Sequence, residues 1–182
     1  MITVISGTNR PNSNTRRVAG LVHDMLSQHG EDTVLLDLVG LPLEIFDNSA
    51  YASKPESFAS FQEAVLSTAG VLTVVPEYNG SFPGALKYFI DMLRFPQSLY
   101  EKPAAFVGLS AGRWGGMRAV EQLEMVFQYR NAHLFGRRCF IPGIDKAFDD
   151  TGQLKDPETA ARLRKTALDF ARFCKSLAQA GP

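Results

Sequence analysis

Short apolar runs alternate with amphipathic stretches along the whole chain. Continuous apolar runs of this length are typical of parallel β-strands that are covered on both faces. Apolar residues in the stretches between them recur with the period of an α-helix. The pattern therefore predicts a parallel sheet flanked by helices. The predicted strands cover residues 2–6, 33–37, 71–75, 104–109 and 138–141.

The helices predicted between these strands have recognisable ends. The first carries Val18, Val22 and Leu26 on one face and stops at Gly30, a residue suited to a helix C-terminus. The last begins at Asp156-Pro157, a capping acid followed by a proline of the first turn. The other helices are predicted at residues 57–68, 83–94 and 117–127, with long loops at 39–56 and 142–155. The loop at 39–56 is either a surface excursion or part of a lid or subunit contact.

Composition narrows the class of protein. A chain of 182 residues is long enough for one well-buried domain, which we expect to cover residues 1–182. Its 19 basic and 19 acidic residues balance, so no overall field favours nucleic acid or anionic lipid. Neither a secretion signal nor an apolar run long enough for a bilayer is present, and Cys139 and Cys174 form no CxxC pair. We expect a soluble cytoplasmic protein. The three histidines have no metal-site spacing, so no metal is predicted.

Glycines and small polar residues gather in three loops, at 7–15, 76–81 and 110–116, each directly after a predicted strand. Loops that follow parallel strands emerge at one edge of the sheet. In a sheet of strand order 2-1-3-4-5, the ligand crevice lies at that edge, between the first and third strands. The loops selected by composition are thus the loops that this topology would select.

The first loop has the chemistry of a phosphate site. It places Thr8, Ser13, Asn14 and Thr15 just ahead of a helix N-terminus, where free N–H groups and the helix dipole favour an anion, and Arg10 adds a planar charged donor. Capping of the helix by Ser13 or Asn14 is the alternative. The loop has neither GxxxxGK[ST] nor GxGxxG, which disfavours P-loop and dinucleotide sites and favours a mononucleotide.

Four segments together resemble the NADPH-dependent FMN reductase family, which includes chromate and quinone reductases and related azoreductases. They are GTNRPNSNTRRVA, LPLEIFDN, PEYNGSFPGALKYFIDML and GLSAGRWGGMRA, and the resemblance runs from Met1 to about Phe135. It implies an α/β, flavodoxin-like three-layer sandwich, with a five-stranded parallel sheet and helices on both faces. Tyr88 and Met92-Leu93 depart from the usual family pattern, in a helix region tied to subunit packing or substrate shape.

The resemblance also implies the FMN-binding residues. The first loop would hold the phosphate, the second would edge the isoalloxazine ring, and the third would close its other side. The implied phosphate residues are Thr8, Arg10, Ser13, Asn14 and Thr15. The implied ring residues are Pro76, Glu77, Tyr78, Asn79, Gly80, Ser110 and Gly112.

The implied activity is an FMN-dependent oxidoreductase that takes hydride from NADPH, or NADH, and reduces quinones or similar acceptors such as chromate, azo compounds or free flavin. Exchange of the two substrates at one flavin gives ping-pong kinetics, and no side chain acts as a nucleophile. The family also implies a homodimer or homotetramer, and Phe95, Leu99 and Tyr100 would suit a subunit interface.

Two other functions compete with this one. The segment Gly108 to Gly112, GLSAG, matches the G-x-S-x-G elbow of serine hydrolases, which requires an acid and then a histidine further along the chain. Only His133 follows, and the acids between, Glu121 and Glu124, lie on the next predicted helix. A flavodoxin-type electron carrier is the second alternative. Such carriers tend to be strongly acidic, whereas this chain is neutral and Arg10 lies in its phosphate loop.

Overall fold

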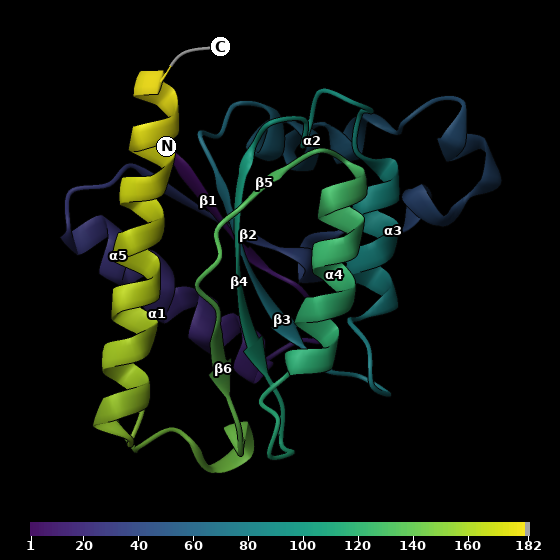
Figure 1. The fold of residues 1–182 in the computed structure, drawn as a ribbon. Coiled ribbons are helices and arrows are strands. Elements are labelled where there is room, and N and C mark those ends of the chain that lie inside the picture. Colours follow the sequence, from purple (N-terminus) through teal and green to yellow (C-terminus); the bar gives the residue numbers. More distant parts are fainter. Residues whose placement is uncertain (181–182) are drawn as a thin grey trace.

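A parallel sheet lies between two layers of helices in the computed structural model, which describes residues 1–180 (Figure 1). Helices α1 (Asn14–Gln28) and α5 (Pro157–Ala180) pack on one face of the sheet. The other face is covered by α2 (Ala59–Leu66), α3 (Gly84–Met92) and α4 (Met117–Tyr129). The predicted three-layer α/β sandwich is confirmed.

The strand order is β2-β1-β3-β4-β5, and every pair is parallel. The first three strands are β1 (Ile2–Ser6), β2 (Thr33–Asp37) and β3 (Val71–Pro76). They are followed by β4 (Pro103–Leu109), β5 (His133–Leu134) and β6 (Cys139–Ile141). The predicted order 2-1-3-4-5 is therefore confirmed, with the first and third strands adjacent.

The fifth position of the sheet is more complex than the single strand predicted at 138–141. Two short segments share the free edge of β4. β5 pairs His133 with Pro103, and β6 pairs Cys139 with Val107. The residues between them belong to neither ladder, and they include exposed arginines that make ion pairs on the surface. A strand of two residues carries no readable periodicity, which is why β5 was missed.

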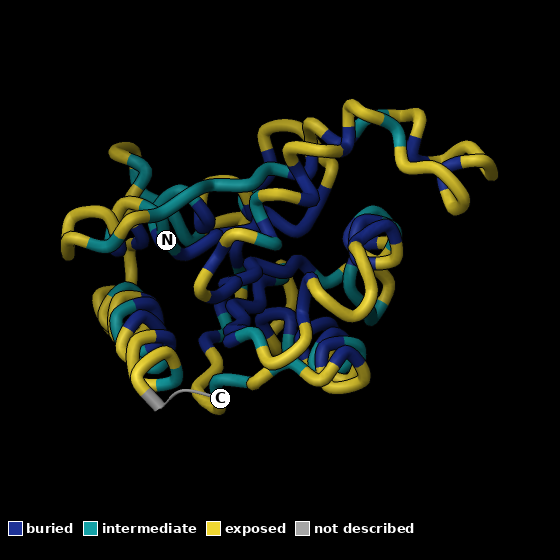
Figure 2. Tube along the Cα trace, turned by 90° about the horizontal axis from the view of Figure 1, so that it is seen from above, coloured by how far each residue is buried: buried dark blue, intermediate teal, exposed yellow. Residues whose placement is uncertain are grey.

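Strand side chains alternate between two hydrophobic cores. Val4 and Val107 face α1 and α5, whereas Ile5 and Phe106 face α2, α3 and α4. The view from above shows the buried stretches concentrated along the sheet and on the inner sides of the helices (Figure 2). Both cysteines lie in the first of these cores, and burial raises the pKa of their thiols, that of Cys174 to about 12. Neither thiol is therefore poised as a nucleophile.

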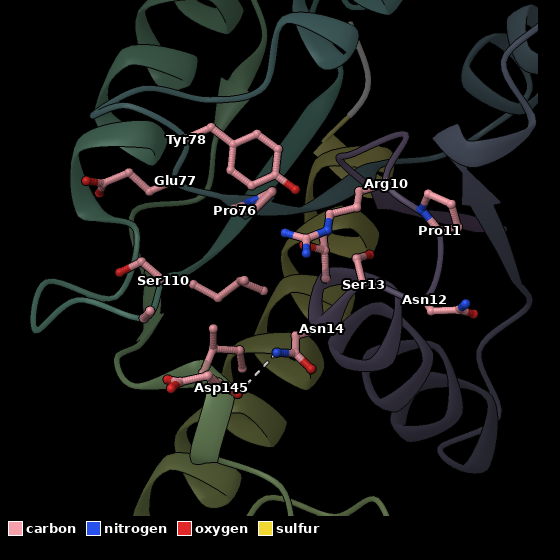
Figure 3. A pocket seen from close by; sticks show the side chains of 14 residues that line it. Arg10, Pro11, Asn12, Ser13, Asn14, Pro76, Glu77, Tyr78, Ser110 and Asp145 are labelled. Carbon is pink, nitrogen blue, oxygen red and sulfur yellow. Dashed lines mark hydrogen bonds between the residues drawn. The ribbon is translucent and has the colours of Figure 1, made fainter.

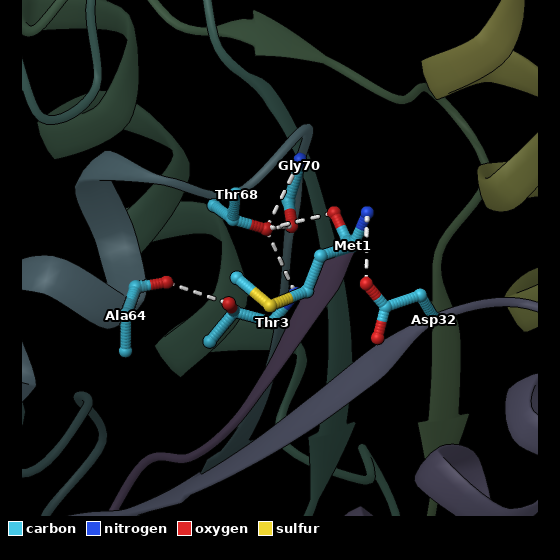
Figure 4. Close-up of polar contacts among 6 residues, drawn as sticks. All are labelled: Met1, Thr3, Asp32, Ala64, Thr68 and Gly70. Carbon is cyan, nitrogen blue, oxygen red and sulfur yellow. Dashed lines mark hydrogen bonds and ion pairs between the residues drawn. The ribbon is translucent and has the colours of Figure 1, made fainter.

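Buried polar groups join α2 to the amino-terminal edge of the sheet (Figure 4). The Thr3 hydroxyl donates to the Ala64 carbonyl at 2.6 Å, and the Thr3 N–H donates to the Thr68 hydroxyl at 3.0 Å. Thr68 in turn donates to the Gly70 carbonyl at 2.8 Å. These hydrogen bonds fix α2 and the residues that precede β3 against the start of β1.

The long loop at 39–56 is folded into three short 3-10 turns, Leu38–Gly40, Leu43–Phe46 and Asn48–Tyr51. It projects beside α3, where the Phe46 ring packs 4.6 Å from the ring of Tyr88 (Figures 1 and 2). Leu99, expected at a subunit interface, is instead buried in the core, while Phe95 and Tyr100 are exposed. Within residues 1–180, no helix is both long and apolar enough to cross a bilayer.

Gly7, the first residue after β1, is required by a close approach to β3. A Cβ added there would lie 2.7 Å from the Val74 carbonyl oxygen and 3.1 Å from Leu86 Cδ2. We expect Gly7→Ala to lower the free energy of unfolding by about 1–3 kcal/mol, because backbone must shift to admit the methyl group. Urea denaturation followed by circular dichroism measures the change.

Gly84→Ala is the matched control, because no atom lies within 4 Å of a Cβ built at Gly84, in the first turn of α3. Alanine is favoured over glycine in a helix, so this variant should be as stable as the parent or slightly more stable. Equal stability of Gly7→Ala and Gly84→Ala would contradict the close approach between the first loop and β3.

Candidate functional site

A cavity of about 650 Å³ lies at the carboxyl edge of the sheet (Figure 3). Its walls come from the loops that follow β1, β3, β4 and β6. The size is that of a small-molecule or cofactor site. The lining residues are Arg10, Pro11, Asn12, Ser13, Asn14, Thr15, Pro76, Glu77, Tyr78, Leu109, Ser110, Ala111, Ile144 and Asp145.

The structure brings most of the predicted site residues together around this cavity. Those that line it are Arg10, Ser13, Asn14, Thr15, Pro76, Glu77, Tyr78 and Ser110. Thr8, Asn79, Gly80 and Gly112 lie in the same loops but are not among the lining residues. Sequence reasoning missed the contribution of Ile144 and Asp145, which follow β6. Since β6 runs parallel to β4, the rule that selected the other three loops also applies to this one.

The amino end of α1 provides hydrogen-bond donors at one end of the cavity. Ser13 caps the helix by accepting the Arg16 N–H at 3.2 Å, so the capping alternative holds for this residue. Capping does not use the N–H groups of Asn14 and Thr15, which lie in the first turn and have no acceptor within the helix. The Arg10 guanidinium extends toward the middle of the cavity (Figure 3). This end of the cavity is therefore suited to an anion.

Thr8 connects the first loop to the second. It is fully buried, its hydroxyl lies 3.1 Å from the Tyr78 hydroxyl, and it accepts the Arg10 N–H at 3.2 Å. Asn14 makes a further connection by donating from Nδ2 to the Ile144 carbonyl at 3.4 Å (Figure 3). These contacts hold three loops in fixed relation around the anion end.

The second loop turns back on itself immediately after the cavity. The Tyr78 N–H donates to the Ser81 carbonyl at 2.8 Å, and the Ser81 N–H donates to the Tyr78 carbonyl at 3.0 Å. Asn79 and Gly80 between them have φ values of 53° and 77°, the signature of a type I′ turn. Asparagine and glycine are the residues that adopt this backbone most readily, so the dipeptide is needed to make the turn.

Helix α4 holds this turn from behind. Gln122 donates from Nε2 to the Gly80 carbonyl at 2.9 Å, and its amide oxygen accepts the Ser81 hydroxyl at 2.6 Å. One helical turn earlier, Arg118 donates from Nε to Glu77 at 2.9 Å. The Glu77 carboxylate is 7% exposed and points away from the middle of the cavity (Figure 3). Glu77 and Arg118 thus serve to position the turn.

The third loop contradicts the serine hydrolase alternative. Ser110 follows the carboxyl end of β4, and its hydroxyl donates to the Gly112 carbonyl at 3.1 Å. His133 pairs with Pro103 at the opposite end of the same strand of seven residues. At roughly 3.3 Å per residue, about 20 Å separates the two, so His133 cannot act as a base for Ser110.

Comparison with known proteins agrees with this geometry. Residues 1–145 match the NADPH-dependent FMN reductase family. The chain belongs to this family. An NAD(P)H-dependent FMN reductase of Pseudomonas aeruginosa is 34% identical over 140 residues, which are 75% of each chain. A quinone reductase of Pseudomonas putida is 32% identical over 178 residues, covering 96% of this chain and 94% of the relative.

The fold has solved counterparts as well. FerB, a flavoenzyme NAD(P)H:(acceptor) oxidoreductase from Paracoccus denitrificans, superposes with a TM-score of 0.78 at 23% identity, covering 96% of this chain and 97% of that one. The predictions of a flavodoxin-like fold, of an oxidoreductase and of FMN with NAD(P)H as co-substrate are therefore confirmed as those of the family.

The cavity fits FMN by its donor chemistry. An anion-binding end formed by α1 and Arg10 suits a phosphate group, because a helix N-terminus and a guanidinium both stabilise negative charge. The other end is walled by Pro76, Leu109 and Ala111, whose apolar surface suits a flat ring. One polar end and one apolar end, in a single cavity, is what a flavin mononucleotide requires.

Proposed function

We propose that this chain binds FMN in the cavity and uses NADPH, or NADH, to reduce quinones or similar acceptors. The observation that carries the proposal is the pairing of an anion end, made by the N-terminus of α1 and Arg10, with an apolar end between the loops after β3 and β4. Similarity to bacterial quinone reductases along nearly the whole chain supports quinones as the acceptor class.

At the phosphate end, the chain supplies charge and direction. The N–H groups of Asn14 and Thr15, together with the Ser13 hydroxyl, surround the phosphate position, and Arg10 neutralises its charge. Since Ser13 already accepts the Arg16 N–H, its own hydroxyl hydrogen is free to be donated to a phosphate oxygen.

At the ring end, the chain supplies shape. Pro76 and Leu109 would provide apolar surface for the ring, and Tyr78, which begins the turn at 78–81, would border it at the cavity wall. FMN, when bound, supplies a ring that accepts a hydride and passes the electrons on. No protein nucleophile is needed, in agreement with buried thiols of raised pKa and with the separation of Ser110 from His133.

Steady-state kinetics of the FMN-loaded protein test the proposal. We expect oxidation of NADPH in the presence of a quinone, with parallel double-reciprocal lines as the quinone concentration is varied, because both substrates meet the same ring in turn. Chromate, azo dyes and free flavin are tested as alternative electron acceptors in the same assay. A flavodoxin-type carrier would bind FMN but would not oxidise NADPH by itself. FMN binding without NADPH oxidation would therefore contradict the proposed reductase and favour an electron carrier.

Arg10 should act on the phosphate of FMN and not on its ring. We expect Arg10→Ala to raise the Kd for FMN by about tenfold to a hundredfold, the value of a hydrogen bond to a charged group, and to leave the Kd for riboflavin unchanged. Quenching of flavin fluorescence on titration with the apoprotein measures both constants. Arg16→Ala is the matched control, because Arg16 pairs with Asp37 at 3.1 Å and does not line the cavity.

A variant at the ring end of the cavity can be tested by the same fluorescence titrations with FMN and riboflavin. Gln122→Ala removes two hydrogen bonds that hold the turn at 78–81, so the Kd values for FMN and riboflavin should rise together. Gln128→Ala, at an exposed position of the same helix, should change neither. A response of Arg10→Ala that is equal for FMN and riboflavin would contradict the assignment of the two ends.

We infer further that the protein forms a homodimer or homotetramer through the outer face of α3 and α4. Phe95, Met125 and Tyr129 are exposed on this face around a hollow of about 450 Å³. Exposed apolar surface of this kind is typical of interfaces. Light scattering should give a multiple of 20.0 kDa for the parent and a lower mass for Met125→Lys combined with Tyr129→Lys. A parent mass equal to one chain would contradict self-association.

A further inference from the structure

A second hollow, of about 340 Å³, adjoins the cavity and has a different chemistry. The loop after β4 contributes Ser110 and Ala111 to the cavity and Arg113 and Trp114 to this hollow. The turn after β6 likewise contributes Ile144 and Asp145 to the cavity and Pro142 to this hollow. The lining residues of the hollow are Arg113, Trp114, Met117, Arg138, Phe140, Pro142 and Arg162. Three guanidinium groups thus converge from three separate segments on a place next to the proposed FMN site.

The positive charge of this hollow is only partly balanced by the protein. Arg138 lies 3.5 Å from Glu124 and 3.6 Å from Glu121. For Arg113 and Arg162, no carboxylate lies within ion-pair distance among the residues that the structure describes. Guanidinium groups held near one another without counter-charges repel, and an anion between them removes the repulsion. The hollow therefore favours an anionic ligand.

Two acids, Asp156 and Glu158, lie shortly before Arg162 in the sequence, and neither forms an ion pair with it among the described residues. Asp156 caps α5 by accepting the Thr159 N–H at 3.0 Å and the Thr159 hydroxyl at 2.5 Å. Arg162 itself donates to the Thr159 hydroxyl at 3.1 Å and to the Phe140 carbonyl at 3.4 Å. Both acceptors are neutral and leave further N–H groups of the guanidinium for a ligand.

An aromatic ring accompanies these charges. Trp114 is 47% exposed, and the Arg113 guanidinium lies 4.5 Å from the centre of its ring. Arginine forks match phosphate oxygens, and an indole face is a stacking surface for a purine base. Hydrogen-bond donors for phosphate beside an aromatic stacking surface suit one chemical class of ligand, a phosphorylated adenosine or a similar nucleotide.

We propose that this hollow binds the phosphate-bearing adenosine half of the nicotinamide dinucleotide whose nicotinamide meets FMN in the adjoining cavity. The inference rests on the proposed function, because a hydride donor must reach the flavin while its other half lies elsewhere on the surface. Arg113 and Arg162 contact phosphate, and Trp114 packs against the base. The phosphate is either the 2′-phosphate found only in NADPH or the pyrophosphate common to both donors.

Kinetics with the two donors test the proposal and assign the phosphate. We expect Arg113→Gln and Arg162→Gln, in the FMN-loaded enzyme, each to raise KM for NADPH about tenfold with kcat nearly unchanged, since the lost contact is far from the reacting atoms. A KM for NADH that stays constant assigns the 2′-phosphate, and an equal rise assigns the pyrophosphate. Arg164→Gln, an exposed position on the same helix and outside the hollow, is the matched control.

Binding is also measurable without catalysis. Trp114 is the only tryptophan of the chain, so tryptophan fluorescence, excited selectively over that of the five tyrosines, reports on the wall of this hollow. Adenosine 2′,5′-bisphosphate should change the fluorescence of the parent with saturation, and Arg162→Gln should weaken that titration about tenfold. The titration is made on the FMN-loaded protein, and on the protein as purified if FMN does not load.

Two kinds of failure remain distinguishable. An unchanged KM in both arginine variants, with no fluorescence response to adenosine 2′,5′-bisphosphate, overturns the inference. The proposed function, reduction of a quinone by NADPH, then still stands. A parent that binds no FMN overturns the proposed function instead, and the fluorescence titration still decides whether the hollow takes a phosphorylated adenosine.

Discussion

The parallel pairing of β1 with β3 is the constraint on which the rest of the site depends. It runs from Thr3 opposite Val71 to Ser6 opposite Val74, and Gly7 continues it by donating its N–H to the Val74 carbonyl at 2.9 Å. Strands that lie side by side but are far apart in the chain send their following loops to the same edge with a gap between them. The cavity occupies this gap, so its position is a consequence of strand order, before any side chain is considered.

Rigid backbone then determines which atoms face the gap. The turn at 78–81 needs two successive residues with positive φ, and its carbonyl and hydroxyl groups are engaged by Gln122 from α4. In the third loop, Gly116 has φ of 87°, and a Cβ there would lie 2.5 Å from the Leu109 nitrogen. Both loops are therefore held by contacts behind them, which leaves their cavity side preorganised for a ligand.

Sequence patterns predicted much of this arrangement, and the misses have physical causes. Continuous apolar runs located the long strands, whereas β5 has two residues and no period to read. Loop composition located three of the four loops that wall the cavity, but not the directions of individual side chains. Thr8 is buried beneath Tyr78, and Asn79 turns with Gly80 outside the lining, because these orientations follow from hydrogen bonds between distant segments. Asp145 was missed because its loop was treated as a connection, although it follows a parallel strand.

The balance of 19 basic and 19 acidic residues conceals an uneven placement of charge. A net charge of zero argues against a strong electrostatic potential over the whole surface. It does not show which positive side chains have a carboxylate beside them. Arg118 is neutralised by Glu77 and Arg16 by Asp37, so these two contribute to structure. Arg10, Arg113 and Arg162 have no such carboxylate among the described residues, and all three line hollows at the carboxyl edge. A guanidinium that faces a hollow without a carboxylate partner is thus the feature on which the proposed roles of these three arginines rest.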